Sequence, residues 1–402
     1  MSSTKLQSYK AIPELEFIAL MAFLMSNVAL SIDAVLPALS HIGKTIDSSD
    51  SSSLKYIISM IFLGLGIGQL IFGSLSDSYG RKPTVILGVG IFVIGTAICL
   101  YSQSLEMMLF GRVLQGFGLA APKTTSISII RDTYSGDNMA RIMSFITVVF
   151  IIVPMIAPII GQLILTAFNW QMIFYFQLLF VLITITWFYL RQKETLPKSK
   201  RKRFNISNFK FSFLEYTKNR NAIFCTLISA LMEGAFIAYL SNSKHIFQDQ
   251  YGLIEEFPYI FAGISLVLGF ATFFNGSLVL KYGMTRLISL ALILFVSSSA
   301  IFLMLFWNSQ NPTITYFMIF LIFQFLAFGF IFGNISALAM EKVGHIAGVG
   351  ASLFTFVSTT LGVIVAVCIG YLFRDTVLPL FFGFLSTGLL SLLLLYRLKG
   401  YN

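Results

Sequence analysis

Long apolar segments alternate with short polar connections along the whole chain. Each apolar segment is long enough to cross a bilayer as a helix, which takes roughly 20 residues. Six lie in the first half, at 15–39, 54–76, 83–102, 106–130, 142–166 and 170–191, and six in the second, at 221–243, 257–280, 285–306, 313–336, 346–370 and 376–397. Short segments of strictly alternating polarity, typical of outer-membrane barrels, are absent. The pattern predicts an all-α polytopic membrane protein with twelve transmembrane helices.

The connection near the midpoint differs from the others because it is long, polar and basic. We therefore expect three parts: an N-terminal six-helix bundle at 1–191, a linker at 192–219 and a C-terminal six-helix bundle at 220–402. A short repeat supports this division. Gly-Ser-Leu at 73–75 is followed by Tyr-Gly at 79–80, and the same residues recur 203 positions later, at 276–278 and 282–283. Many secondary transporters consist of two such pseudo-symmetric halves with the substrate site between them.

Composition agrees with a membrane protein and excludes several other classes. Hydrophobic residues make up 57% of the 402 residues and charged residues 11%, too few charges to cover a soluble protein of this size. The three cysteines lie in apolar segments and the three histidines are far apart, so we expect neither disulfides nor a metal site. No phosphate-binding loop of the G-x-x-x-x-G-K-[ST] type occurs, so we expect no ATP-driven motor. We also expect no cofactor and no enzyme activity. The first apolar segment is too long for a cleavable signal peptide.

The net charge of +10 is distributed asymmetrically across the predicted spans. If both termini are cytoplasmic, 21 of the 27 Lys and Arg residues fall in cytoplasmic segments and four in segments on the other side. This asymmetry matches the positive-inside rule. The basic run at 198–203 is therefore expected to contact anionic lipid head groups rather than nucleic acid.

The connection between the second and third spans carries a recognisable motif. Residues 73–83 read G-S-L-S-D-S-Y-G-R-K-P, with Gly73 able to permit close helix approach and Gly80 a tight turn. The segment resembles the G-x-L-x-D-x-x-G-R-K/R loop of the major facilitator superfamily. That resemblance implies the major facilitator fold. It also implies that Gly73, Asp77, Gly80 and Arg81 form a conformational latch on the cytoplasmic side.

Two further motifs lie within spans. Residues 112–120 are similar to the R-x-x-Q-G-x-G-x-A element of the same superfamily, and Arg112 must point into the bundle or snorkel to the membrane edge. In the fifth span, Pro154 and Pro158 each remove a helix hydrogen bond and predict a kink. Together with Gly161 they partly resemble the antiporter element of drug exporters, although a kink without that meaning is an open alternative.

Other matches, best at 33–175 and 328–352, resemble the Bcr/CflA branch of bacterial drug:proton antiporters. They include Asp33 before Leu-Pro at 36–37 and Asn334 within a glycine-rich tenth span. The resemblance implies a monomeric multi-pass protein of the bacterial inner membrane, and it adds Asn334 to the residues expected to bind substrate. The chain departs from the branch at Val35, Ser74 and Gly333, among other positions.

Four ionisable residues lie within spans: Asp33, Arg112, Lys123 and Glu233. Charges are costly in lipid, so each is a candidate for substrate binding, and Asp33, Glu233 and Arg112 are also candidates for proton coupling. Simpler placements remain open. Asp33 could sit at the interface, Lys123 could snorkel, and Glu233 could pair with a polar neighbour that only packs the halves.

We therefore expect a proton-coupled secondary transporter that exports amphipathic small molecules by alternating access. The alternative is a proton-coupled transporter of one metabolite, including an anionic compound such as a carboxylate siderophore, which Lys123 would favour. A membrane receptor without transport activity is a third reading, but the sequence offers no signalling domain.

Overall fold

The computed structural model describes residues 12–46, 51–134, 136–201, 213–307, 311–341, 347–372 and 376–399. Its long elements are all helices: α1 Glu14–Asp33, α3 Tyr56–Tyr79, α4 Arg81–Leu100, α5 Leu105–Thr133, α6 Gly136–Ala167, α7 Gln171–Arg191, α9 Arg220–Lys244, α10 Phe257–Tyr282, α11 Met284–Phe306, α12 Ile314–Met340, α13 Ala347–Tyr371 and α14 Leu378–Lys399. They match the twelve predicted spans in order and confirm the all-helical, polytopic fold. Between α1 and α3 lie the short helices η1 Leu36–Ala38, α2 Leu39–Thr45 and η2 Ser51–Lys55.

Within the described ranges, ten helices are long and apolar enough to cross a membrane, and Ile152–Ala167 of α6 forms a shorter apolar segment. The remaining helix, α5, is less apolar because it carries Arg112, Lys123 and several hydroxyl side chains. Its charged side chains are turned toward neighbouring helices rather than lipid, as intramembrane charges require. The chain is therefore a multi-pass membrane protein.

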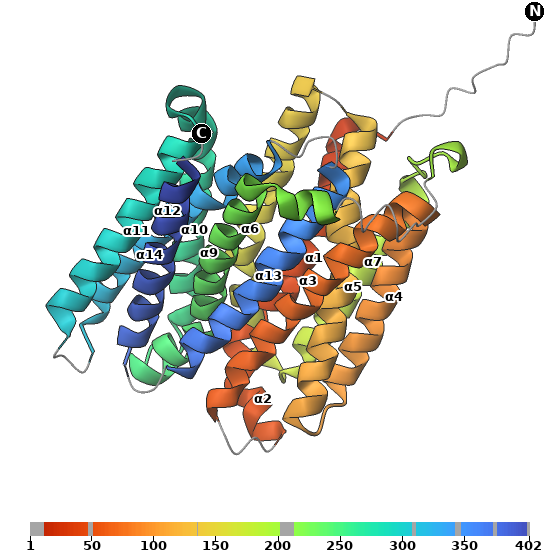
Figure 1. Ribbon diagram of the computed structural model, residues 1–402. Helices are drawn as coiled ribbons and strands as arrows, with labels where there is room; N and C mark the ends of the chain where they lie inside the picture. The colour runs from red at the N-terminus through yellow and green to blue at the C-terminus, as the bar shows by residue number, and fades with distance from the viewer. Residues whose placement is uncertain are drawn as a thin grey trace, which may run out of the picture.

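The helices form two bundles that stand side by side, with the N-terminal helices on the right of Figure 1 and the C-terminal helices on the left. We call them the N lobe (α1 and α3–α7) and the C lobe (α9–α14). Between the lobes, α3 packs along α13 and α6 packs along α10. We call the end of the bundle where α1 begins and α14 ends the terminal face, and the end that carries α2 the opposite face (Figure 1).

The internal repeat seen in the sequence has a structural counterpart. Gly80 separates α3 from α4, and Gly283 separates α10 from α11 at the matching place in the C lobe. Their φ angles are 107° and 77°, which residues with a Cβ rarely adopt. Both glycines thus allow a direct helix-to-helix turn, so the repeat marks equivalent turns in the two lobes.

The first span is not the single helix expected for 15–39. The helix α1 ends at Asp33, and the chain continues through η1 before α2 begins at Leu39. Pro37 explains the break, because it has no N–H to donate to the carbonyl of Asp33 and disfavours helix in the residue before it. The break leaves Asp33 at the end of a helix in the middle of the protein.

The expected linker 192–219 lies between the end of α7 at Arg191 and the start of α9 at Arg220. It contains η3 Lys198–Lys200, which is one turn long, and a helical segment at 213–218, and its residues 202–212 lie outside the described part of the chain. The last two residues of the basic run at 198–203 fall in that interval. The division into three parts at 1–191, 192–219 and 220–402 therefore stays a prediction.

Candidate functional site

A cavity of about 240 Å³ lies between the two lobes. Seven helices contribute to it, α1, α3, α5 and α6 from the N lobe and α9, α10 and α12 from the C lobe. Its wall is mostly apolar, with four phenylalanines from the C lobe: Phe236, Phe261, Phe325 and Phe332. The ionisable side chains in the wall are those of Asp33 and Lys123. The cavity has the position and the lining of a site for an amphipathic small molecule.

Asp33 is the carboxylate of this cavity. The residue is 5% exposed and lines the wall from the broken end of α1. Its carboxylate accepts no hydrogen bond and makes no ion pair with any residue that the structure describes. Buried carboxylates normally have such partners. A negative charge on Asp33 is therefore costly unless a proton or a bound cation neutralises it.

Tyr239 of α9 lies near Asp33 and interacts electrostatically with it. The Tyr239 ring is fully buried, stacks on Phe261 with centroids 6.3 Å apart and meets the edge of Phe325 at 4.9 Å. Its hydroxyl has no hydrogen-bond partner among the described residues. A buried hydroxyl without a partner is unusual and costs free energy. Asp33 and Tyr239 therefore offer two unsatisfied polar groups beside an aromatic wall.

Lys123 and Glu233 form a second polar group that joins the lobes. Lys123 of α5 lines the cavity, and it interacts electrostatically with Glu233 of α9. Glu233 is not in the cavity wall. Its carboxylate accepts a hydrogen bond of 2.8 Å from the hydroxyl of Thr359 in α13. The charge of Lys123 is thus opposed by Glu233, whereas Asp33 has no such counterpart.

Arg112 is completely buried inside the N lobe and does not line the cavity. Its guanidinium donates to the backbone oxygen of Ser31 from both Nη atoms at 3.0 Å and to that of Ile57 from Nε at 3.1 Å. It also donates to the side chain of Gln115 at 2.8 Å. The Ser31 oxygen is available because α1 ends two residues later. Arg112 therefore ties α1, α3 and α5 together around the helix break.

Asn334 also lies away from the cavity wall. Its side-chain amide exchanges two hydrogen bonds, of 2.7 and 3.2 Å, with that of Asn275 in α10. The pair joins α10 to α12 inside the C lobe. Of the five residues expected to bind substrate, the structure brings Asp33 and Lys123 into the cavity wall and sets Glu233 beside Lys123. Arg112 and Asn334 are placed inside their own lobes.

Sequence reasoning did not single out Tyr239 or Thr359. Tyr239 is one of many aromatic residues in the spans, and Thr359 stands in a stretch of hydroxyl residues at 358–360. Tyr239 stands six residues after Glu233 in α9, a spacing that puts the two side chains on different faces of the helix. The sequence pattern therefore carried no signal that singled out Tyr239 or Thr359.

At the terminal face, Arg81 holds the motif segment together. Its buried guanidinium forms ion pairs with Asp77 at 2.6 Å and with Asp132 of α5 at 2.8 Å, and it donates to the hydroxyl of Ser76. Gly80 makes the turn that brings Arg81 back over α3. Gly73 lies one turn before Asp77 and faces Ser352 of α13, where a Cβ would approach the Ser352 hydroxyl to 2.6 Å. Of the expected latch, Gly73 thus lies against the C lobe, Arg81 and Asp77 pair within the N lobe, and the latch role stays a prediction.

The linker contributes to the same region through Glu194. Its carboxylate accepts hydrogen bonds from the backbone N–H groups of Arg81 at 2.9 Å and Lys82 at 3.0 Å. These are among the unpaired N–H groups at the start of α4, so Glu194 caps that helix from outside. The next residue, Thr195, donates to Asp132 at 3.0 Å. The beginning of the linker is therefore part of the ion-pair cluster around Arg81.

The prolines of α6 lie against the break in α1. Pro154 lines the cavity and Pro158 is buried one turn further on. A Cβ at Gly161 would collide with the backbone oxygen of Ala34, the residue that follows α1. Gly161 is thus required for the close approach of α6 to the broken helix. This placement shows what Gly161 does for packing, while an antiporter role for the element stays a prediction.

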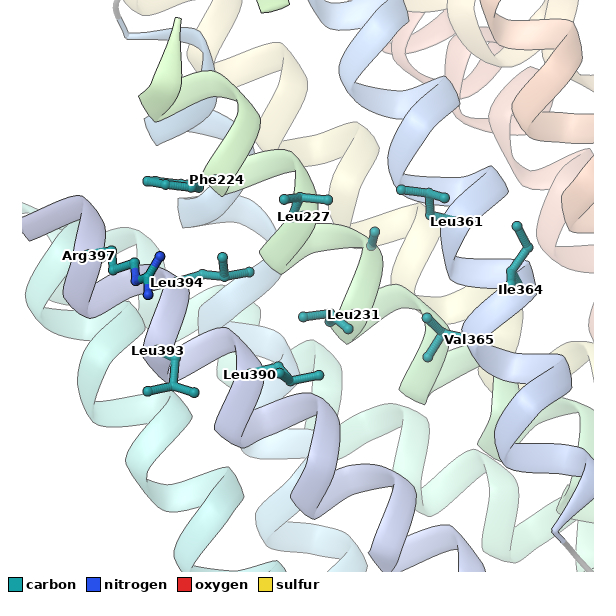
Figure 2. Close-up of a pocket in the computed structure, with 11 residues that line it drawn as sticks. Phe224, Leu227, Leu231, Leu361, Ile364, Val365, Leu390, Leu393, Leu394 and Arg397 are labelled. Atoms are coloured by element: carbon teal, nitrogen blue, oxygen red, sulfur yellow. The ribbon is translucent and has the colours of Figure 1, made fainter.

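A larger groove of about 460 Å³ lies on the C lobe between α9, α13 and α14 (Figure 2). Ten of its eleven lining residues are apolar, and Arg397 stands at its end near the terminal face. Leu393 and Ile364 are more than half exposed, as expected for side chains that meet lipid. The groove carries one charged side chain, so the cavity between the lobes is the better candidate site for transported molecules.

Comparison with known proteins agrees with this architecture. The family model described as Major Facilitator Superfamily matches residues 17–367. The chain is 28% identical over 402 residues to a bicyclomycin resistance protein homolog of Haemophilus influenzae, with 96% of each chain covered. It is 26% identical over 260 residues to the multidrug resistance protein MdtL of Escherichia coli, covering 62% of this chain and 65% of that one.

Solved structures show the same fold. The crystal structure of a D-xylose–proton symporter superposes with a TM-score of 0.73 at 12% sequence identity, covering 94% of this chain and 96% of the symporter. Two six-helix lobes with a cavity between them are the architecture of secondary transporters rather than of enzymes. From the family match across most of its length and from this fold, the chain is a member of the major facilitator superfamily of membrane transporters.

Proposed function

We propose that this protein exports amphipathic small molecules, cationic ones above all, in exchange for protons. The observation that carries the proposal is the unpaired carboxylate of Asp33 in an apolar cavity between the lobes. An isolated negative charge in such surroundings is costly, so the carboxyl group is stable when it is protonated or when a cation is bound beside it. A proton and a cationic substrate then occupy the same group in turn, which is the requirement for exchange.

The walls of the cavity support the cationic class of substrate. Aromatic faces attract cations, and four phenylalanines and Tyr239 surround the region of Asp33. The names of two relatives, a bicyclomycin resistance protein homolog and a multidrug resistance protein, support export of drug-like compounds. The cavity of about 240 Å³ is small for such compounds, so lobe movement has to enlarge it.

Alternating access is the second part of the proposal. The lobes touch at the terminal face, where Gly73 meets Ser352, and at the opposite face, where Lys55 donates to the backbone oxygen of Gly370. A cavity with contacts at both ends corresponds to an occluded state between the two open ones. Rocking of the lobes would break one set of contacts at a time, with the Arg81 cluster restoring closure at the terminal face.

The positive-inside asymmetry supports a terminal face in the cytoplasm. The bacterial relatives support the inner membrane as the location. We propose that the transporter works as a monomer, because each chain contains both lobes and the complete cavity.

Reconstitution tests the proposal directly. The full-length protein in proteoliposomes should accumulate a lipophilic cation when a pH gradient is imposed and should lose that accumulation without the gradient. Asp33→Asn should abolish gradient-driven accumulation and keep a folded protein. Asp249→Asn is the matched control, because Asp249 is exposed and lies outside the cavity. If Asp33→Asn keeps full gradient-driven activity, exchange at Asp33 is excluded.

One observation favours a second candidate, transport of an anionic compound. Lys123 also lines the cavity and could contact a carboxylate. A panel of lipophilic cations and carboxylates separates the two, combined with Lys123→Gln. If carboxylates are transported and Lys123→Gln abolishes their transport, the anionic substrate class replaces the cationic one. Our expectation is the reverse, because the charge of Lys123 is already opposed by Glu233.

A further inference from the structure

A second, polar cavity of about 150 Å³ lies between the lobes on the terminal side of the first one. The helices α3, α5 and α13 line it, and its residues are Gln69, Gly73, Ser74, Asp77, Thr124, Ile127, Ser128, Arg131, Ala351, Ser352 and Thr355. Nearly all of these are polar or small. We call this cavity the vestibule. It does not share a lining residue with the cavity that contains Asp33.

Gln69 is the clearest sign that the vestibule holds water. The residue is 1% exposed, lines the vestibule, and its side-chain oxygen has no hydrogen-bond donor in the described residues. The hydroxyls of Thr124 and Thr355 donate within their own helices, at 2.8 Å each, and keep acceptor positions open. Such a set of acceptors in a polar space is satisfied by ordered water.

Glu233 is not in the wall of the vestibule, but each of the three helices carries, within one turn of the vestibule lining, a residue that lines the first cavity or interacts with Glu233. On α3, Gln69 of the vestibule lies one helical turn from Leu65 of the first cavity. On α5, Thr124 of the vestibule adjoins Lys123, which interacts with Glu233. On α13, Thr355 lies one turn from Thr359, which donates to the Glu233 carboxylate. One turn is a rise of about 5.4 Å, a distance that one water bridges with two hydrogen bonds.

The outer end of the vestibule reaches the terminal face. Asp77 and Arg131 line it there, and Arg131 is exposed. Asp77 and Arg131 are thus the titratable groups in the described lining of the vestibule, and Lys123 and Glu233 lie beyond its inner end. Their opposite charges would oppose the passage of other ions, whereas a proton can move along hydrogen-bonded water.

We propose that the vestibule is the water-filled path by which Glu233 exchanges protons with the aqueous phase at the terminal face. An O–H bond forms on the Glu233 carboxylate as one breaks on the nearest water, which at the same time gains a proton from the next water toward the terminal face, and the reverse relay returns the proton. Gln69 and Thr355 are positioning residues that hold this water. The inference rests on the proposed proton exchange at Asp33 and extends it, because it makes Glu233 a second protonatable group with its own route to the terminal face.

Thiol accessibility provides the first test. In a variant with Cys99, Cys225 and Cys368 replaced by serine, Thr355→Cys should react with a membrane-impermeant thiosulfonate added from the terminal side. Ile364→Cys on the lipid-facing groove of α13 is the control and should not react. If Thr355→Cys stays unreactive in a transporter that still couples to a pH gradient, the vestibule is dry and the proposal is overturned.

Transport kinetics provide the second test and need no cysteine replacement. The double variant Gln69→Leu with Thr355→Val should slow gradient-driven transport about tenfold, as expected when hydrogen bonds to two water-holding groups are lost. Substrate counterflow without a gradient should be unchanged, since the Asp33 cavity is intact. Equal rates in both assays would overturn the proposal. A wild-type protein without any gradient-driven transport would instead overturn the proposed function.

Discussion

The hydroxyl groups of Ser59 in α3 and Ser241 in α9 lie 3.0 Å apart, although 182 residues separate them in the chain. They join the N lobe to the C lobe near the opposite face. Both serines are buried. Because their contact joins the two lobes, it can exist only while the lobes are closed at that face.

A disulfide between these positions should lock the transporter. We expect Ser59→Cys with Ser241→Cys to lose transport upon oxidation and to regain it upon reduction, because the lobes could no longer separate at the opposite face. Transport with and without reductant measures the effect. Each single variant is a control and should stay active under both conditions. Full activity of the oxidised, cross-linked double variant would contradict alternating access at this interface.

Removal of Arg112 should destabilise the N lobe rather than only slow transport. Arg112→Ala leaves the buried carbonyl of Ser31 without its donors, and we expect a loss of about 3 kcal/mol or more. Arg112→Lys should be intermediate, because an ammonium group cannot donate from two fixed nitrogens to one oxygen. Thermal unfolding of the purified protein in detergent is the measurement. Arg397→Gln, at an exposed arginine, should unfold like the wild type, and equal stability of Arg112→Ala would refute this role.

Loss of the Glu194 carboxylate should loosen the start of α4. Glu194→Ala removes the acceptor of the Arg81 and Lys82 amides, with an expected cost of about 1 kcal/mol, as for other lost helix caps. Hydrogen exchange of those two amides should accelerate. Glu255→Ala, in an exposed loop, serves as the control. Unchanged exchange at both amides would show that the contact contributes nothing to the cap.

Acidic conditions should weaken cation binding. Because a proton and a cation are expected to compete for Asp33, the affinity should rise with increasing pH, by at most about tenfold per pH unit. Binding of a fluorescent lipophilic cation at several pH values measures it. Asp33→Asn should flatten the dependence. A wild-type affinity that stays constant or rises toward low pH would contradict the competition.

The helical fold follows closely from the sequence, because long apolar segments have few alternatives in a membrane. The side-chain contacts of the candidate site could be predicted from the sequence to a much smaller extent than the fold. The helix pattern could not reveal that Arg112 would bind the carbonyl of Ser31, because that oxygen becomes available only through the break at Pro37. Glu194 stands in a polar segment that was expected only to connect the halves. Its role depends on the position of α4, more than a hundred residues earlier in the chain.

The asymmetry between the two intramembrane carboxylates depends likewise on packing. Asp33 and Glu233 are both acidic residues in apolar segments, and the sequence made both of them candidates for proton coupling. In the structure Glu233 has Thr359 and Lys123 as neighbours, whereas Asp33 has an aromatic wall. Only the three-dimensional arrangement of α5, α9 and α13 creates this difference.

The break in α1 also determines where the positive charge of Arg112 is balanced. The last carbonyls of a helix carry a partial negative charge from the helix dipole, and a cation is stabilised there. Arg112 occupies that position at Ser31. Its charge is therefore met by the backbone rather than by a carboxylate. Asp33, two residues further along, is therefore not needed as the counter-ion of Arg112, and its carboxylate can bind a proton or a cationic substrate.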